Sequence, residues 1–267
     1  MPDGPVRVLV HAGFHKTGTS SLQDFLRRNR AALKPWLDYY GKADFLEAGA
    51  AARRYGQRPF PWRLWLFRRQ LRRFLATIPD APLIVLSRET FAGVMPGHRD
   101  WRGRMVQGYA ATAIPLARAV IAELRRRFGP GVRIEFLYTT RDRERWIRSV
   151  YGHLLRSIHL TEEFGAFRAR FPDLAAPDEE ARRIAAALPC PVHAARLEDH
   201  AAAPAGPATP VLDLAGVPAE ARARLVPAGR SNVGQTPEME AEFLRLNRSG
   251  KARAQLKRIK DRMLAEG

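Results

Sequence analysis

A short run of residues near the start of the chain carries the clearest chemical signal. It holds two glycines, Gly13 and Gly18, with a lysine, Lys16, between them and hydroxyl side chains close by. The whole run reads Gly13-Phe14-His15-Lys16-Thr17-Gly18-Thr19-Ser20-Ser21. Glycines permit a tight loop whose N–H groups can surround an anion, which lysine and hydroxyl groups can bind further. The run therefore predicts a phosphate-binding loop.

The residues on either side of this loop predict the elements that hold it. An apolar stretch at 6–10 predicts a buried strand before it, and Leu22, Phe25 and Leu26 predict a helix behind it by their spacing. The N–H groups and the dipole of a helix N-terminus both favour an anion. A strand, a glycine loop and a helix in this order form a phosphate cradle.

The loop differs from the one that binds ATP or GTP, which reads G-x4-G-K-[ST]. Gly13 and Gly18 keep the spacing and Ser20 keeps the hydroxyl, but Thr19 occupies the lysine position. The lysine lies inside the loop instead, at Lys16. We expect the cation to reach the bound anion from a different direction.

A second candidate anion site follows a later predicted strand, at 133–138. Arg141 comes where this strand should end, and Ser149 lies eight residues further on, inside a predicted helix at 143–158. A guanidinium can bind a phosphate with two parallel hydrogen bonds, and a hydroxyl can add a third. The chain thus offers two anion sites in sequence.

These two segments resemble those of sulfotransferases that use 3′-phosphoadenylyl sulfate (PAPS), and the pattern is closer to the bacterial-type members. The 5′-phosphosulfate loop of that family has the form [GP]-x-x-[KR]-[TS]-G-[TS]-[TS], which residues 13–20 fit. Its 3′-phosphate element has an arginine after a strand, a serine eight residues later and then an aromatic residue. Here these are Arg141, Ser149 and Tyr151.

The resemblance also has departures and weaker parts. Arg143 stands where many members have proline, and Trp146 where glycosaminoglycan-modifying members often have arginine. The run Arg196-Leu197-Glu198-Asp199 resembles a segment that shapes the fold around the site, and Arg230-Ser231-Asn232 resembles a loop that can close over the nucleotide. The departures weaken any transfer of acceptor specificity from the family.

The resemblance implies an enzyme that transfers a sulfuryl group from PAPS to a hydroxyl or amine acceptor, a carbohydrate or another small metabolite. The product nucleotide is 3′-phosphoadenosine 5′-phosphate (PAP), Lys16 stabilises the charge that develops on the leaving phosphate, and no metal is expected. The implied nucleotide ligands are Gly13, His15, Lys16, Thr17, Gly18, Thr19, Ser20, Ser21, Arg141 and Ser149.

The expected site also needs a general base, for which the sequence offers several candidates. Glu89 follows the predicted strand 83–86, and a carboxylate there could accept the proton of the acceptor. The alternative for Glu89 is a structural ion pair with Arg88 or another arginine. The alternative bases are His11, His15 and His153.

Strand and helix patterns alternate along the chain. The predicted strands are 6–10, 83–86, 133–138 and 192–197, and the predicted helices include 60–78, 107–128 and 143–158. Such alternation predicts an α/β fold with a central parallel sheet flanked by helices, in which ligands bind at the carboxyl ends of the strands. With the resemblance, this becomes a three-layer P-loop NTPase-like fold.

We expect a single domain over 1–267. An alanine- and proline-rich stretch at 201–210 predicts an irregular connection. Residues 236–265 predict a basic helical region that is broken at Ser249-Gly250.

Composition narrows the class of protein. The chain has 267 residues, of which 46% are hydrophobic, so it can form a sizeable core. Its lone cysteine, Cys190, excludes an internal disulfide and a cysteine-based zinc site. The sequence shows neither a signal-peptide pattern nor an apolar run of the roughly 20 residues needed to cross a bilayer. We expect a cytoplasmic protein.

The net charge of +18 attracts anions such as a nucleotide, an acidic glycan, a nucleic acid or an anionic membrane. The absence of zinc-finger spacing, of an RNP-type aromatic motif and of a heptad repeat with a basic region argues against nucleic-acid binding. The basic helix predicted at 60–78 carries Trp62 and Trp65 among arginines. It could be an ordinary surface helix, a rim that holds an anionic or sugar-like acceptor, or a membrane-surface helix.

Two other functions compete with sulfuryl transfer. A P-loop kinase is disfavoured by Thr19 in the lysine position and by the lack of a clear magnesium-binding aspartate after an apolar strand. A non-catalytic nucleotide- or polyanion-binding protein would keep Lys16 and Arg141 but lack a working base. A sulfotransferase would select nucleotides with a 3′-phosphate, whereas a P-loop kinase would not. Transfer of sulfate to an acceptor would distinguish a sulfotransferase from a non-catalytic binding protein. The sequence identifies neither the acceptor nor the oligomeric state.

Overall fold

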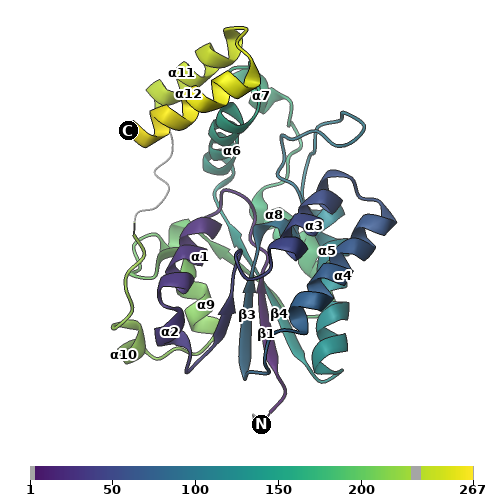
Figure 1. The fold of residues 1–267 in the computed structure, drawn as a ribbon. Helices are drawn as coiled ribbons and strands as arrows, with labels where there is room; N and C mark the ends of the chain where they lie inside the picture. Colours follow the sequence, from purple (N-terminus) through teal and green to yellow (C-terminus); the bar gives the residue numbers. More distant parts are fainter. Residues whose placement is uncertain (1–3, 230–235, 267) are drawn as a thin grey trace. The chain divides into compact units, whose positions relative to one another are not determined.

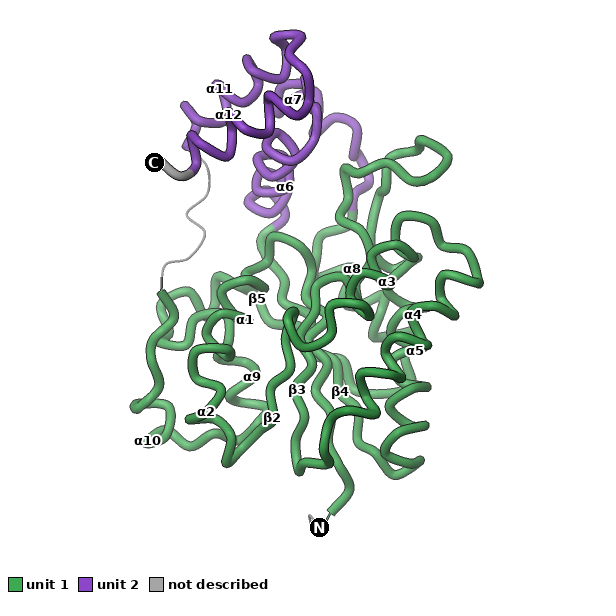
Figure 2. The backbone as a smooth tube through the Cα atoms, viewed as in Figure 1, with its two compact units in different colours: residues 1–142, 175–231 green, residues 143–174, 232–267 purple. Residues whose placement is uncertain are grey.

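The computed structural model describes residues 4–229 and 236–266, and contacts divide the chain into two compact units. The first contains residues 1–142 and 175–231, and the second contains residues 143–174 and 232–267 (Figure 2). The expectation of one domain over the whole chain stays a prediction.

The first unit is built around a five-stranded sheet in which all neighbouring strands are parallel. The strand order is β2-β3-β1-β4-β5, so β1 is the central strand. The strands are β1 (Arg7–His11), β2 (Asp38–Tyr40), β3 (Leu83–Ser87), β4 (Arg133–Thr140) and β5 (Val192–Arg196). This confirms the prediction of an α/β fold with a central parallel sheet.

Helices cover both faces of this sheet (Figure 1), as the continuous apolar runs of the central strands require. One face carries α1 (Thr19–Arg28), α2 (Arg30–Leu33) and α9 (Thr209–Leu214). Leu9, Val85 and Leu137 of the sheet and Leu22 and Leu26 of α1 share one buried cluster on this face. The start of α1 is therefore held on the sheet directly behind the glycine loop.

The other face carries α3 (Leu46–Gln57), α4 (Pro61–Leu75), α5 (Ala110–Phe128) and α8 (Pro177–Ala187). α4 begins with proline at its first position, where the missing N–H costs nothing, and buries Phe67, Leu71 and Leu75. α5 is followed by Gly129, whose positive φ of 85° is readily adopted by glycine. Short segments complete the unit: η1 (Glu89–Ala92), η2 (Glu198–His200), η3 (Gly206–Ala208) and α10 (Ala219–Arg222).

The second unit consists of the helices α6 (Arg143–Ser157), α7 (Phe164–Ala169), α11 (Pro237–Arg248) and α12 (Arg253–Glu266). A buried lysine, Lys260, ties three of its segments together. Its ammonium donates to the Leu155 carbonyl at 2.6 Å and to Asn247 Oδ1 at 2.5 Å. The break between α11 and α12 falls at 249–252 and confirms the expected interruption at Ser249-Gly250.

The predicted strands and the predicted helices at 60–78, 107–128 and 143–158 are all present, with bounds that shift by a few residues. The expected irregular connection at 201–210 is only partly right, because η3 and the start of α9 lie within it. The sequence analysis did not predict β2, α3 or α8. β2 is a three-residue edge strand, and such a length carries little periodic signal.

Within the described part of the chain, the structure contains no helix that is both long and apolar enough to span a membrane.

Leu22→Ala tests how strongly the core holds the helix behind the glycine loop. Leu22 is fully buried, so we expect a loss of about 2–5 kcal/mol in the free energy of unfolding, measured by urea denaturation. Leu46→Ala is the matched control, because that side chain is 54% exposed and its removal should cost less than about 0.5 kcal/mol. Equal losses in the two variants would contradict this account of the core.

Candidate functional site

The glycine loop between β1 and α1 is held in an uncommon backbone conformation. Lys16 has a φ of 68°, and it is the only non-glycine residue with positive φ in the described chain. Gly18 follows with a φ of 92° and forms the N-cap of α1 without a side-chain cap. A non-glycine residue with positive φ is strained, and such strained residues are found most often at functional sites. The first N–H groups of any helix have no acceptor within that helix, so the start of α1 suits an anion.

The first glycine of the loop is fixed by close packing. A Cβ atom at Gly13 would lie 2.4 Å from Nε2 of His11 and 2.7 Å from the hydroxyl oxygens of Thr19 and Thr139. These distances are too short for any larger residue. Polar side chains therefore press against the loop backbone from the sheet side.

Two hydroxyl groups of the loop turn inward. Thr17 Oγ1 donates to the carbonyl of Phe14 at 2.7 Å, and Thr19 Oγ1 donates to the same carbonyl at 3.2 Å. Thr17 Oγ1 also lies 2.9 Å from Thr139 Oγ1 in a hydrogen bond. Both side chains are buried, so their hydroxyls hold the loop in shape. Ser20, in contrast, is exposed in the first turn of α1.

A buried polar network connects this loop to the carboxyl ends of three strands. His11 Nδ1 is hydrogen-bonded to Ser87 Oγ at 2.8 Å, and Nε2 lies 3.4 Å from Thr139 Oγ1. Gln23 Nε2, on α1, donates hydrogen bonds to Ser87 Oγ at 3.2 Å and to Glu89 Oε2 at 3.3 Å.

Burial lowers the pKa of His11 to about 4, although the charge of Glu89 opposes this shift. His11 is therefore a neutral structural residue at neutral pH, and its burial speaks against its alternative role as general base.

The candidate base Glu89 lies at the edge of this network. Burial of its carboxyl alone would raise its pKa, but a backbone hydrogen bond, the charges of His15 and Arg88 and the hydrogen bond from Gln23 lower it instead. Burial also lowers the pKa of His15 to about 4, while Glu89 opposes this shift and Lys16 adds to it. At neutral pH the site thus contains an ionised carboxylate beside a neutral imidazole.

An aromatic stack packs the loop against the start of α5. The Phe14 and Tyr109 rings stack with their centroids 4.5 Å apart, and Tyr109 OH lies 3.4 Å from His15 Nδ1. The His15 and Tyr109 rings are 7° from parallel. Tyr109 is fully buried, so it fixes the orientation of the His15 ring.

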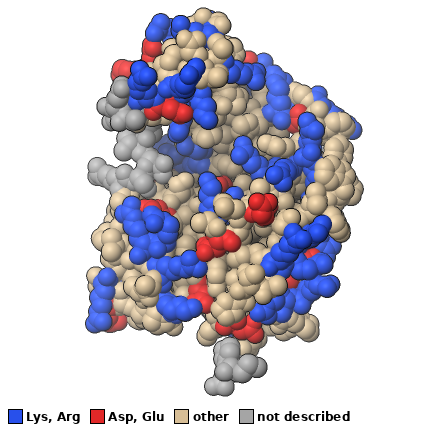
Figure 3. Space-filling view, in the orientation of Figure 1, with Lys and Arg blue, Asp and Glu red and all other residues tan. Residues whose placement is uncertain are grey.

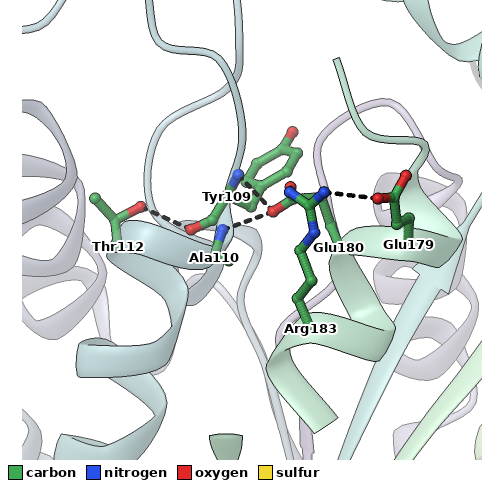
Figure 4. A network of polar contacts seen from close by, with 6 residues as sticks. All are labelled: Tyr109, Ala110, Thr112, Glu179, Glu180 and Arg183. Carbon is green, nitrogen blue, oxygen red and sulfur yellow. Dashed lines mark hydrogen bonds and ion pairs between the residues drawn. The ribbon is translucent and has the colours of Figure 1, made fainter. Parts of the chain in front are cut away.

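Tyr109 is itself fixed by a buried carboxylate from α8 (Figure 4). Glu180 Oε2 accepts hydrogen bonds from the backbone N–H groups of Tyr109 at 2.8 Å and of Ala110 at 2.6 Å. A carboxylate at a helix N-terminus satisfies N–H groups that have no partner within the helix and interacts favourably with the helix dipole. The sequence analysis missed this residue, because it lies 71 positions from Tyr109 and follows no motif.

Arg141 lies beside the glycine loop, as the second predicted anion site requires. Its Nη1 donates to the carbonyl of Lys16 at 3.3 Å, and its Nε lies 3.9 Å from Glu198 Oε1. Glu198 also accepts a hydrogen bond from the N–H of Asp142 at 3.3 Å.

The segment around Glu198 packs on the loop, since a Cβ at Gly18 would lie 2.8 Å from Leu197 Cδ1. The first unit thus brings Arg141, Lys16 and the segment at 196–199 together.

The remaining predicted residues belong to the second unit or lie outside the described residues. Ser149 is half-buried in α6 of the second unit, and His153 belongs to the same helix. The segment Arg230-Ser231-Asn232 lies outside the described residues. Among the residues that the structure describes, no group of three or more His, Cys, Asp or Glu side chains is arranged to hold a metal ion.

Positive charge is abundant around these elements. On the face drawn in Figure 3, lysine and arginine side chains cover more of the surface than aspartate and glutamate do. This agrees with the net charge of +18 and gives the molecule a field that attracts anionic ligands.

His11→Asn tests the buried neutral histidine. Between pH 6.5 and 4 the unfolded chain binds a proton on His11 that the folded chain does not, so stability should fall as the pH falls through this window. We expect His11 to contribute about 2 kcal/mol to the stability difference between pH 7.5 and pH 5, measured by urea unfolding at both values. The variant should lose this part of the pH dependence.

The control for this measurement is His159→Asn, which changes an exposed histidine and should keep the pH dependence of the original protein. Full pH dependence in His11→Asn would rule out the assignment of His11 as a buried neutral residue.

Neither a comparison with protein-family models nor one with curated proteins found a match to this chain.

Proposed function

We propose that this chain is a PAPS-dependent sulfotransferase with a P-loop NTPase-like fold, which transfers a sulfuryl group to a hydroxyl or amine acceptor. The observation that carries the proposal is the glycine loop at 13–21 after the central strand, with Lys16 inside it and Arg141 hydrogen-bonded to its backbone. A carbohydrate or another small metabolite is the proposed acceptor class.

The loop supplies the proposed 5′-phosphosulfate site. Its backbone N–H groups and the N-terminus of α1 suit a phosphate, and the close packing at Gly13 holds the loop against His11 and Thr139 of the sheet. PAPS provides the activated sulfuryl group when bound. Lys16 is proposed to stabilise the negative charge that develops on the departing phosphate oxygen, a contribution made mainly in the transition state.

Arg141 is the proposed ligand of the 3′-phosphate. Its guanidinium lies within hydrogen-bond distance of the loop backbone, so a nucleotide on the loop could reach it with a second phosphate. Ser149 is proposed as its partner from the motif spacing alone. A 3′-phosphate ligand is what would distinguish PAPS from ATP.

Glu89 is the proposed proton acceptor. Its pKa is lowered from a usual value that already lies well below 7, so it is ionised at neutral pH and can take the proton of an acceptor hydroxyl without first losing one of its own. Gln23 holds one carboxylate oxygen and orients the group. The neutral imidazole of His15 is the alternative acceptor, and Tyr109 orients it.

The first test is calorimetric binding of PAP, ADP and ATP at two salt concentrations. We expect PAP to bind at least tenfold more tightly than ADP, because Arg141 adds charge-assisted hydrogen bonds worth about 1.5–3 kcal/mol each. Arg141→Ala should remove this preference. Arg133→Ala, at the opposite end of the same strand, is the matched control and should leave it unchanged.

A preference for ATP over PAP would instead support a P-loop kinase. Unselective binding that disappears with added salt would indicate a basic protein with a general affinity for polyanions.

Lys16→Ala tests the catalytic role. We expect turnover, followed as PAP release from PAPS with a panel of hydroxyl acceptors, to fall about 10²–10³-fold while PAP affinity changes much less. Lys34→Ala, which changes an exposed lysine at the end of α2, should preserve both quantities. Equal losses of turnover and affinity in Lys16→Ala would count against a transition-state role.

A further inference from the structure

Two exposed tryptophans and a half-buried phenylalanine form a short row at the start of α4. Phe60 lies just before the helix, and its ring centroid is 6.5 Å from that of Trp62 and 5.1 Å from that of Trp101. Trp62 is 55% exposed and Trp101 is 45% exposed, although tryptophan is highly buried on average. We call these three residues the aromatic row. Trp101 comes from the loop 93–108, so two distant segments build one surface.

Arginine flanks both ends of the aromatic row. The guanidinium of Arg63 lies 4.8 Å from the Trp62 ring centroid, and that of Arg102 lies 4.6 Å from the Trp101 ring centroid. Each indole therefore has a cation on its ring and keeps substantial exposed area. The rigid rings offer a surface for stacking, and the planar guanidinium groups beside them can bind the carboxylates of a ligand.

The two segments that build the row carry little negative charge. α4 contains no acidic residue, and Asp100 is the only one in the loop 93–108. Asp100 is occupied by the backbone N–H groups of Arg102 and Arg104 and by the Arg104 side chain. Arg69 and Arg73 add positive charge on the exposed side of α4. The surface is thus complementary to an anionic ligand that also presents flat, weakly polar faces.

We propose that the aromatic row binds a uronic-acid-containing oligosaccharide and so holds the acceptor of the reaction. A pyranose ring presents C–H groups on one face, which suit the negative face of an indole. The carboxylate of each uronic acid would pair with Arg63 or Arg102, and the spacing between neighbouring rings is comparable to one sugar residue. This identification of the acceptor class rests on the proposed function.

The loop that carries Trp101 connects the row to the candidate site. It begins directly after η1, which contains Glu89, and it ends at Tyr109, whose hydroxyl lies 3.4 Å from His15. Both candidate proton acceptors are therefore adjacent to the ends of this loop. An oligosaccharide on the row would lie on a segment that is anchored at the site on both sides.

The same features argue against membrane insertion. An interfacial helix presents a broad apolar face to the lipid. The exposed side of α4 carries Arg69 and Arg73 after its two tryptophans. Of its other apolar residues, Phe67, Leu71 and Leu75 are buried and Leu64, Leu66 and Phe74 are half-buried. A surface of indole rings flanked by arginines, with no exposed aliphatic side chains on α4, suits a carbohydrate better than the acyl chains of a membrane.

The test uses an unsulfated hyaluronan decasaccharide, in which glucuronic acid alternates with N-acetylglucosamine, with binding measured by calorimetry at physiological salt. We expect Trp62→Ala and Trp101→Ala each to weaken binding at least tenfold. The matched control is Trp65→Ala, because Trp65 is 58% exposed on the same helix, carries Arg69 over its ring and lies outside the row. This control should change affinity less than twofold.

Three further ligands identify the occupant. A neutral cello-oligosaccharide of similar length should bind at least tenfold more weakly than hyaluronan, since it lacks the carboxylates. Lack of hyaluronan binding, equal effects of all three tryptophan substitutions, or tighter binding to a ten-nucleotide oligo(dT) or to phosphatidylglycerol vesicles would overturn the proposal.

PAP binding separates this proposal from the proposed function. The tryptophan variants should bind PAP as the original protein does. Selective PAP binding without hyaluronan binding would overturn the aromatic row as an acceptor site and leave the sulfotransferase proposal standing. Hyaluronan binding that depends on Trp62 and Trp101, without PAP selectivity, would support the row as a carbohydrate site and overturn the sulfotransferase proposal.

Discussion

The parallel pairing of β1 with both β3 and β4 is the constraint on which the candidate site depends. The register places His11 opposite Ser87 on one side and Leu137 on the other. Because all three strands run in the same direction, the segments that follow them emerge at one edge of the sheet. This geometry brings together the loop with Lys16, the turn with Glu89 and the residue Arg141.

Burial and local polar contacts together set the charge of each group at this edge. His11 is enclosed among hydroxyls and stays neutral, because a buried imidazolium would lose its hydration. Glu89 stays ionised because hydrogen bonds and neighbouring charges outweigh its burial. The edge therefore combines a rigid neutral layer beneath the glycine loop with a carboxylate at its rim. Such an arrangement can hold an anion and accept a proton at the same time.

The start of α5 links this edge to the surface. Glu180 fixes the backbone of Tyr109, and Tyr109 fixes the loop through Phe14 and His15. The segment that leads to Tyr109 carries Trp101 at the exposed aromatic row. A single loop thus joins the candidate proton acceptors to the surface proposed for the acceptor, so the two proposals depend on one structural element.

The sequence by itself determined the strands β1, β3, β4 and β5, the glycine loop and the position of Arg141 after a strand, since each leaves a local pattern of apolar spacing or special residues. Only the tertiary structure decided the contact of Arg141 with Lys16, the inward turn of Thr17, the cap that Glu180 provides and the row formed by Phe60 and Trp101. The physical reason is range. Backbone preference acts over a few residues, whereas these contacts either join positions far apart in the chain or depend on which side chains a buried loop encloses.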